Sequence, residues 1–308
     1  MPTDGSGDGR IQVSGLTKQY KRLRAVDNLS FTVEPGRVTG FLGPNGSGKT
    51  TTLRMILNLV TPTAGGATIG GRRYSHLGEP SREVGAVLEA SSAHRGRSGR
   101  GHLRIIAAAA GLPDSRVAEV LEMTALTPAA KRKFKAYSLG MRQRLGIAAA
   151  MLGDPRVLIL DEPANGLDPE GIRWMREFLR ALADQGRTIL VSSHLLAEME
   201  LLADDLIIIA NGRLIRQGTV EEVVKSSQTG VVVHVRTPQP AELVAAVSAR
   251  GGLASSLPDG RIAVAGLEAA GVGNAAFTAG VELHELTTER PDLEGVFLEL
   301  TQGQAAIR

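Results

Sequence analysis

One short stretch limits the fold of this chain more than any other, because it joins a strand-like segment to a helix-like segment through glycines. Residues 43–51 read Gly-Pro-Asn-Gly-Ser-Gly-Lys-Thr-Thr and match the pattern G-x-x-x-x-G-K-[ST]. Residues 37–42 before it read as a short β-branched, apolar strand. After it, apolar residues recur at helical spacing, at positions 53, 56, 57 and 60. A strand, a glycine loop and a helix in this order predict a parallel α/β sheet with a phosphate-binding loop.

The loop has the chemistry of a phosphate site. Glycines permit close approach of the backbone, and the start of the following helix adds partial positive charge to a row of N–H groups. We expect the Lys49 ammonium to reach the β- and γ-phosphates of a nucleotide and the Thr50 hydroxyl to face Mg²⁺. A glycine turn beside a surface lysine is the alternative, but it leaves the four fixed positions and their flanks unexplained. The residues predicted to surround the phosphates are Gly43, Asn45, Gly46, Ser47, Gly48, Lys49, Thr50 and Thr51.

Two carboxylates follow a second strand-like segment. Residues 156–160, Arg-Val-Leu-Ile-Leu, are almost entirely apolar, which is typical of a strand buried on both faces of a parallel sheet. Asp161 and Glu162 then lie at the carboxyl end of that strand, where α/β sheets bind ligands. We expect Asp161 to hold Mg²⁺, directly or through water, and Glu162 to orient and deprotonate a water that attacks the γ-phosphate. An acidic turn capped by Pro163 is a reasonable alternative for this tripeptide taken alone, and it loses most of its weight downstream of a phosphate loop.

The composition sets outer limits on the kind of protein. A length of 308 residues with 43% hydrophobic content suffices for one large and one smaller domain, and the 3% aromatic content makes the core aliphatic. The chain has no cysteine, which excludes disulfides and thiolate metal sites and suits a reducing compartment. Residues 1–10 are glycine-rich and predict a disordered tail, not a signal peptide. No apolar run approaches the length that crosses a bilayer, so we expect a soluble chain.

Basic residues gather in two places, although the net charge is only +3. A groove for nucleic acid would interleave aromatic side chains with the basic ones, and only Phe134 and Tyr137 are near. We therefore expect no nucleic acid partner and favour a docking surface for another protein. The basic residues are Arg95, Arg97, Arg100 and Arg104, then Lys131, Arg132, Lys133 and Lys135.

Apolar periodicity and turn residues predict the order of the elements. Helical patterns between residues 101 and 152 indicate a helical insert between strands of the sheet. The predicted strands cover residues 11–17, 25–33, 37–42, 67–71, 83–88, 156–160, 188–192, 205–210 and 213–217, and in the tail 231–235, 261–264 and 281–286. The predicted helices cover residues 51–60, 103–110, 115–124, 139–152, 170–184, 219–225, 241–250 and 291–300.

With these features in order, residues 11 to about 225 resemble the nucleotide-binding subunit of ABC transporters. Residues 137–144, Tyr-Ser-Leu-Gly-Met-Arg-Gln-Arg, are similar to the signature loop of that family, which is usually Leu-Ser-Gly-Gly-Gln. Residues 165–168 read Asn-Gly-Leu-Asp, and His194 follows the next buried strand. A phosphate loop alone is shared by many nucleotide-binding proteins, whereas this whole series is specific to the ABC family.

The resemblance implies a role for each matching residue. Tyr20 would stack on adenine, and His194 would be the switch histidine that holds the γ-phosphate. Lys49 and Glu162 would act on the γ-phosphate and its attacking water, with Thr50 and Asp161 serving Mg²⁺. The remaining residues would act across an interface between two copies that share each ATP. Ser138 and Gly140 would touch the ATP of the opposite copy, and Asp168 would lie on the loop between the copies.

The resemblance also implies a fold and a division into domains. We expect a P-loop NTPase of the ABC type, with a parallel-sheet core, an antiparallel β subdomain and a helical subdomain, followed by a small C-terminal α/β domain. The expected bounds are a disordered tail at 1–10, the ATP-binding domain at 11–225 with its helical subdomain at about 90–153, and the accessory domain at 229–302. The tail resembles that of bacterial drug and antibiotic export ATPases, which often ends in a Leu-Glu-x-Val-Phe-Leu pattern.

Three positions depart from the family pattern. Leu139 replaces the first signature glycine and Met141 replaces the glutamine, which makes γ-phosphate contact by this loop less secure. Glu89 stands where the family's coupling loop carries glutamine. Its carboxylate would still offer oxygen to Mg²⁺, but it adds negative charge beside a triphosphate. We therefore predict weaker nucleotide affinity, or stronger Mg²⁺ dependence, than glutamine would give, which an ATP titration of Glu89→Gln measures.

The expected function is an ATPase subunit, with ATP and Mg²⁺, that powers a separately encoded membrane permease. The resemblance implies export of a drug, antibiotic or lipid-like compound, a homodimer or a heterodimer with a like subunit, and a cytoplasmic position, peripheral on the inner face of the membrane. The permease would dock on the helical insert near Glu89, including the arginines between residues 95 and 104. Two alternatives remain open: a soluble ABC ATPase with a role outside transport, and a regulatory module that binds ATP with little turnover.

Overall fold

The computed structural model of the chain describes residues 8–88, 93–226, 231–289 and 292–301. These residues form two compact units, one built from the chain up to Val220 together with Thr301, the other from Glu221 to Leu300. Among the residues that the structure describes, no helix combines the length and the apolar composition needed to span a bilayer.

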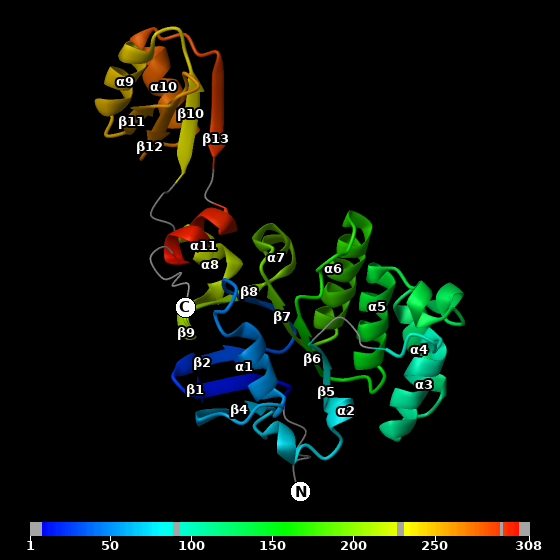
Figure 1. Cartoon of the computed structure of the whole chain (residues 1–308). Helices are drawn as coiled ribbons and strands as arrows, with labels where there is room; N and C mark the ends of the chain where they lie inside the picture. Colours follow the sequence, from blue (N-terminus) through cyan, green and yellow to red (C-terminus); the bar gives the residue numbers. More distant parts are fainter. Residues whose placement is uncertain (1–7, 89–92, 227–230, 290–291, 302–308) are drawn as a thin grey trace, which may run out of the picture. The chain divides into compact units, whose positions relative to one another are not determined.

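A six-stranded sheet forms the centre of the first unit (Figure 1). Its order is β5-β6-β7-β3-β8-β9, and every neighbouring pair is parallel except β8 and β9, which form an antiparallel hairpin. All residues of the three central strands are buried, as their continuous apolar sequences predict. The strands are β3 (Val38–Leu42), β5 (Val84–Val87), β6 (Val157–Asp161), β7 (Thr188–Ser193), β8 (Asp205–Ala210) and β9 (Arg213–Thr219).

A three-stranded antiparallel sheet lies beside the first, in the order β2-β1-β4. It consists of β1 (Ile11–Tyr20), β2 (Leu23–Val33) and β4 (Ala64–Ile69). Helix α1 (Lys49–Ile56) shares one apolar core with both sheets, since Leu53 of α1 clusters with Val13 of β1 and Ile159 of β6. This core holds the helix that follows the glycine loop in a fixed position.

Helix α1 is shorter than the predicted helix over residues 51–60. It ends at Ile56, and Asn58 takes a left-handed φ of 56°. Asparagine tolerates this conformation better than most residues, and a left-handed residue just past the last turn ends a helix.

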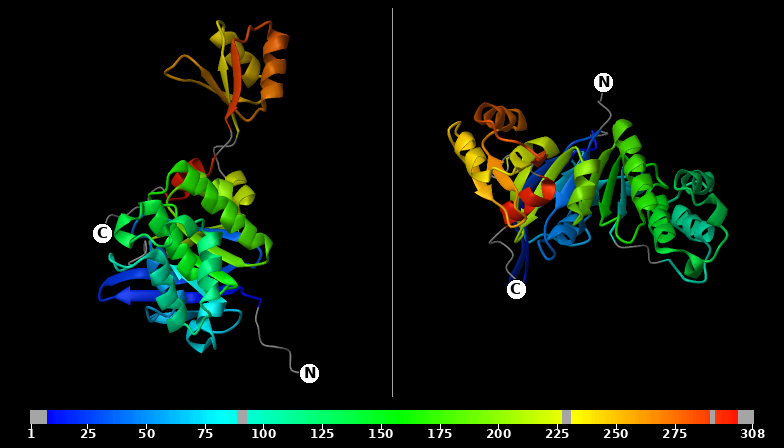
Figure 2. Two further views of the ribbon diagram at one scale, coloured as in Figure 1. Left: turned by 90° about the vertical axis from the view of Figure 1, so that its right-hand side faces the viewer. Right: turned by 90° about the horizontal axis from the view of Figure 1, so that it is seen from above.

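Most helices of the first unit lie between β5 and β8 in the sequence. Helices α3 (Gly99–Ala109), α4 (Ser115–Met123) and α5 (Leu139–Ala150) form the helical insert between β5 and β6. Helix α6 (Pro169–Asp184) joins β6 to β7, and α7 (Leu196–Leu202) joins β7 to β8. Figure 2 shows the helical insert grouped beyond α6 at one side of the sheet. The short helical turns are α2 (Pro80–Glu83) and 3-10 turns at Tyr74–His76, Thr127–Ala129 and Phe134–Ala136.

The second unit contains a four-stranded antiparallel sheet in the order β11-β12-β10-β13, with helices α9 and α10 on one face. Its core joins Val233 and Val264 of the sheet to Leu243 and Val272 of the helices. The elements of the C-terminal part are α8 (Val220–Lys225), β10 (Val232–Arg236), α9 (Pro240–Ser248), β11 (Leu253–Ser256), β12 (Ile262–Ala265), α10 (Ala269–Ala279), β13 (Glu285–Glu289) and α11 (Leu293–Thr301).

The predicted strand over residues 281–286 is wrong in position. Gly280 ends α10 with a left-handed φ of 67°, and the Val281 N–H donates to the carbonyl of Ala276. Val281 and Leu283 then pack against the core of the unit, and the strand begins only at Glu285. The apolar alternation that suggested a strand therefore comes from residues that close the helix.

Candidate functional site

The glycine loop, residues 43–51, connects β3 to α1 and includes the first residues of the helix. Gly48 is the residue before the helix, with a φ of 104°. A Cβ at Gly48 would lie 2.5 Å from the carbonyl oxygen of Ala25, so both the dihedral and the space require glycine. The Ser47 N–H donates to the carbonyl of Pro44 at 3.1 Å, which closes the loop into a turn. The loop leads directly into the start of α1, where the first backbone N–H groups have no partner within the helix and can bind an anion.

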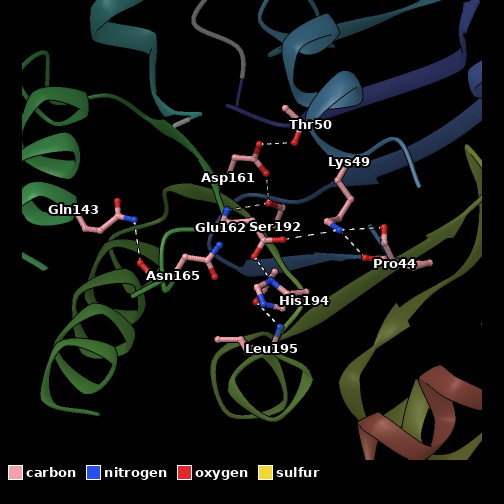
Figure 3. Close-up of polar contacts among 12 residues, drawn as sticks. Pro44, Lys49, Thr50, Gln143, Asp161, Glu162, Asn165, Ser192, His194 and Leu195 are labelled. Atoms are coloured by element: carbon pink, nitrogen blue, oxygen red, sulfur yellow. Dashed lines mark hydrogen bonds and ion pairs between the residues drawn. The ribbon is translucent and has the colours of Figure 1, made fainter. Parts of the chain in front are cut away.

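Lys49 is the best-buried cation of this region, with 7% of its surface exposed. Its Nζ donates to the carbonyl oxygens of Gly43 at 2.5 Å and Pro44 at 3.4 Å, and lies 3.9 Å from Glu162 Oε1 (Figure 3). Burial lowers the pKa of the Lys49 ammonium, and the charges of Glu162 and Asp161 oppose this only in part. An anion in the loop would supply the compensation that this ammonium lacks.

Ser47 provides a test of whether the loop fits a phosphate chain. Its side chain is 3% exposed, and its Oγ has no hydrogen-bond partner among the described residues. A buried hydroxyl without a partner is costly, and a phosphate oxygen would satisfy it. Asn45 and Gly46 are exposed at the tip of the loop, while Thr51 follows in the first turn of α1. The donors of this loop therefore fit a phosphate group.

Thr50 and Asp161 meet at the position predicted for a divalent cation. The Thr50 hydroxyl donates to Asp161 Oδ2 at 2.7 Å, which joins the start of α1 to the end of β6. Neighbouring ligands of an octahedral Mg²⁺ lie about 2.9 Å apart when metal–oxygen distances are about 2.1 Å, so this spacing fits a shared ion. Within the described ranges, no three His, Cys, Asp or Glu side chains form a metal cluster by themselves. Mg²⁺ in phosphate sites takes few protein ligands and completes its shell with phosphate oxygens and water, so the pair is sufficient.

Glu162 has an uncommon backbone conformation, with a left-handed φ of 50°. Such a conformation costs a non-glycine residue about 1–2 kcal/mol. The Glu162 N–H donates to both the carbonyl oxygen and the hydroxyl of Ser192, at 3.1 Å and 3.0 Å. The end of the neighbouring strand β7 thus holds the strained residue in place, with its carboxylate turned toward Lys49 and His194 (Figure 3).

His194 follows β7 and contacts the carboxylate of Glu162. Its Nδ1 lies 2.7 Å from Glu162 Oε2, and since an ionised carboxylate only accepts, we assign the proton to Nδ1. The His194 side chain is about half exposed, so the second ring nitrogen can meet a ligand. Because β6, β7 and β3 are adjacent, their carboxyl ends bring Asp161, His194 and the glycine loop to one edge of the sheet.

Ser192 is a residue of this site that the sequence did not single out. It is fully buried, and its hydroxyl donates to Asp161 Oδ1 while accepting from the N–H of Glu162. One serine of the adjacent strand therefore contacts the carboxylate of Asp161 and the backbone of Glu162. The only available signal was a pair of serines that ends a buried strand immediately before His194.

The signature segment and the loop that ends at Asp168 both begin helices. Ser138 precedes α5, and its hydroxyl accepts from the N–H of Met141 at 3.2 Å, which leaves the hydroxyl proton free to donate. Asp168 precedes α6 in the same way and accepts from the N–H of Gly171 at 2.9 Å. Gln143 Nε2 donates to the carbonyl of Asn165 at 3.3 Å and joins the two segments (Figure 3).

The remaining predicted residues lie on other elements of the chain. Gly140 is in the first turn of α5 with Ser138, on the helical insert. Tyr20 ends β1 with 45% of its surface exposed, and the Lys18 ammonium lies 4.9 Å from the centre of its ring. Glu89 lies outside the described residues. The structure thus brings together the glycine loop, Thr50, Asp161, Glu162 and His194.

Comparisons with known proteins identify relatives of the whole chain and of its first part. The family described as ABC transporter matches residues 26–165, and a domain of unknown function matches residues 231–294. The uncharacterized ABC transporter ATP-binding protein YhcH of Bacillus subtilis is 38% identical over 94% of this chain and 95% of its own length. The bacitracin transport ATP-binding protein BcrA of Bacillus licheniformis is 42% identical over 67% of this chain and 69% of its own length. A solved structure of an ATP-binding subunit of an ABC transporter, 29% identical, superimposes with a TM-score of 0.63 over 70% of this chain and 92% of its own.

Proposed function

The chain belongs to the family of ABC transporter ATP-binding proteins, and from this premise we propose that it powers an exporter whose permease is a separate chain. The observation that carries the proposal of ATP turnover is the position of Glu162, whose carboxylate lies 2.7 Å from His194 Nδ1 and 3.9 Å from Lys49 Nζ. A base, an electrophilic ammonium and a polar imidazole at one sheet edge suit hydrolysis of a terminal phosphate. The similarity of this chain to a bacitracin transport protein supports export of an antibiotic-like or lipid-like compound.

The glycine loop would bind the phosphates of ATP. Lys49 would exchange its bonds to the carbonyls of Gly43 and Pro44 for bonds to the β- and γ-phosphates. The hydroxyl of Ser47 and the first N–H groups of α1 would donate to the same oxygens. Thr50 and Asp161 would hold Mg²⁺, which supplies charge neutralisation at the phosphates when it is bound. Tyr20 would stack on the adenine.

Glu162 would take a proton from the attacking water while His194 fixes the carboxylate and touches the γ-phosphate. The hydrogen bond between the two side chains leaves one carboxylate oxygen for water. Ser192 would keep the backbone of Glu162 in its strained conformation throughout. Catalysis of this kind consists mostly of positioning and charge stabilisation around an in-line water.

The signature segment would complete the site of a second copy. Ser138 and Gly140 lie on the helical insert, and the Ser138 hydroxyl has a proton to donate, so both suit the γ-phosphate of an ATP held by another chain. Asp168 would lie between the two copies. Two such composite sites join a homodimer, or a heterodimer with a like subunit, and hydrolysis lets the copies separate.

The permease would contact the helical insert, which carries basic residues at Arg95, Arg97, Arg100 and Arg104. This contact would hold the chain on the inner face of the cell membrane. Co-purification with the product of a neighbouring reading frame that has about six spanning segments would identify the partner.

Replacement of Glu162 by glutamine tests the proposal. The amide keeps the size of the side chain but cannot act as a base, so steady-state ATP hydrolysis should fall by about 100-fold or more. Binding of ATP should remain, because the glycine loop is intact. A variant that keeps the ATPase rate of the original chain, or an original chain with no turnover beside its permease, would favour a regulatory ATP-binding module instead.

A further inference from the structure

Two leucines and two glycines interlock where the first turn of α5 meets the loop after β6. A Cβ built at Gly166 would lie 2.0 Å from Leu139 Cδ2 and 3.0 Å from Leu139 Cγ. A Cβ built at Gly140 would lie 3.3 Å from Leu167 Cδ2. Each leucine therefore occupies space that the glycine of the opposite segment leaves open. The amide of Gln143, which donates to a carbonyl of the same loop, adds a polar contact beside the apolar ones.

Gly166 meets two independent requirements in this interlock. Its φ of +73° lies in the left-handed region, which side chains disfavour, and the 2.0 Å approach means that Leu139 must move before even a methyl group fits. Leu139 stays 46% exposed, so its contact with the loop covers only part of the side chain. A leucine that served only to fill a core would be more completely buried.

The interlock joins residues to which we assign different tasks. The loop begins next to Glu162, whose backbone is already strained, and ends at Asp168, which caps α6. The first turn of α5 carries Ser138 and Gly140. These two residues would touch the nucleotide of a second copy, whereas Glu162 acts on the nucleotide of its own copy.

We propose that Leu139 is a positioning residue that holds the first turn of α5 and residues 163–168 as one body. When the signature turn contacts a nucleotide of the second copy, the shift of this body is transmitted through Gly166 to Glu162 of the same chain. The proposal rests on the proposed function, because it assumes that two copies share each ATP. It gives a task to the leucine that replaces a family glycine, and Leu139 itself touches no reacting atom.

A size exchange between the two positions tests the proposal. Gly166→Ala introduces a methyl group into the space of Leu139 Cδ2, so the turnover number should fall at least tenfold. The KM for ATP should stay within about twofold, because the glycine loop is untouched. Leu139→Ala alone removes the contact and should lower the turnover number severalfold, again without a change in KM. The double variant has alanine at both positions, so the clash at residue 166 is absent. It should turn over ATP at least fivefold faster than Gly166→Ala.

A control separates the clash from the backbone strain of alanine at a positive φ. Gly186 has a φ of +85° with no atom within 4 Å of a built Cβ, so Gly186→Ala carries the strain without the clash. Its turnover should match that of the original chain. If Gly166→Ala fails to fold, Leu139→Met replaces the test, because methionine retains the volume and flexibility to reach Gly166 and should keep the rate that Leu139→Ala loses.

Two results would overturn the inference: equal turnover of Gly166→Ala and the original chain, or no gain in the double variant. In the second case Leu139 would not act through Gly166. These outcomes are distinct from failure of the proposed function, which appears as absence of ATP turnover in the original chain or absence of stimulation by any permease. A drop in turnover that comes entirely from a raised KM would also contradict the proposal, since it would indicate damage to nucleotide binding.

Discussion

At the scale of single residues, Ser192 contacts both Asp161 and Glu162, the two acidic residues proposed to serve hydrolysis. Its hydroxyl is fully buried, donates to Asp161 and accepts from the N–H of Glu162. Replacement by alanine leaves a buried carboxylate oxygen without its donor and removes one of the two acceptors that hold the N–H of Glu162, while the carbonyl of residue 192 remains. We expect Ser192→Ala to lower the turnover number at least tenfold while the protein remains folded.

The matched control for this prediction is Thr39→Val on the neighbouring strand β3. Thr39 is 1% exposed, and its hydroxyl has no partner among the described residues, so its removal costs no hydrogen bond. Steady-state kinetics of both variants measure the difference. Equal turnover numbers for Ser192→Ala and Thr39→Val would show that the serine has no role in holding the carboxylates.

The destabilisation that results from burying the Lys49 ammonium can be measured directly. Because burial lowers the pKa of Lys49, the fold disfavours the charge that is proposed to bind the phosphates. A lowered lysine pKa destabilises the folded state at neutral pH, and this penalty fades as the pH rises toward the ordinary pKa of 10.5. We expect Lys49→Met to raise the melting temperature of the nucleotide-free protein at pH 7, and this gain to shrink toward pH 10.

The same melting experiment is then repeated with Mg-ATP. The original chain should melt at a higher temperature with nucleotide, as binding to the folded state requires, whereas Lys49→Met should not respond. A lower melting temperature for nucleotide-free Lys49→Met than for the original chain would mean that the contacts of the ammonium with Gly43 and Pro44 outweigh the cost of its burial.

At the scale of elements, Asp168 caps a helix, and the same residue is proposed to lie between two copies. It accepts from the N–H of Gly171 at the start of α6, a cap whose loss costs about 1 kcal/mol. Asp168→Ala should lower the free energy of unfolding in urea by this amount, while Asp168→Asn should retain most of it because asparagine caps equally well. If alanine and asparagine lower stability to the same extent, the charge matters to α6 and the cap does not.

The elements that hold the site could be predicted from the sequence because their signals are local. The apolar run before Asp161 and the run that ends at Ser192 each predicted a buried parallel strand, and adjacent parallel strands bring their carboxyl ends together. Helices α2, α7 and α10 and strand β11 were not predicted. The sequence of α10 is rich in alanine and glycine, which weakens its apolar periodicity, and β11 has only four residues.

Contacts between distant parts of the chain could not be predicted. The sequence identified Leu139 as a departure from a pattern but could not reveal its contact with Gly166, which lies 27 positions further on. Ser192 was missed for the same reason, since its partner Asp161 ends another strand and its partner Glu162 follows that strand. The roles of Tyr20, Ser138, Gly140 and Asp168 stay predictions, because they concern a nucleotide and a second copy. Glu89 stays a prediction because it lies outside the described residues.

At the scale of the whole molecule, two copies are proposed to share each nucleotide. The residues of the glycine loop proposed to bind ATP and those proposed to close over it lie on different parts of one chain, at the carboxyl edge of the sheet and on the helical insert. A single copy would therefore bind ATP without completing its site. Dimer formation should need both the nucleotide and an intact signature segment.

The most direct test is the mass of Glu162→Gln in solution at saturating Mg-ATP, measured by light scattering after size exclusion. The variant should keep ATP bound and therefore hold two copies together, which gives twice the chain mass of 32.4 kDa. Without nucleotide, or with Ser138→Arg added to block the closing contact, the mass should return to that of one chain. A variant that binds Mg-ATP yet stays monomeric, alone and beside its permease, would contradict the shared site.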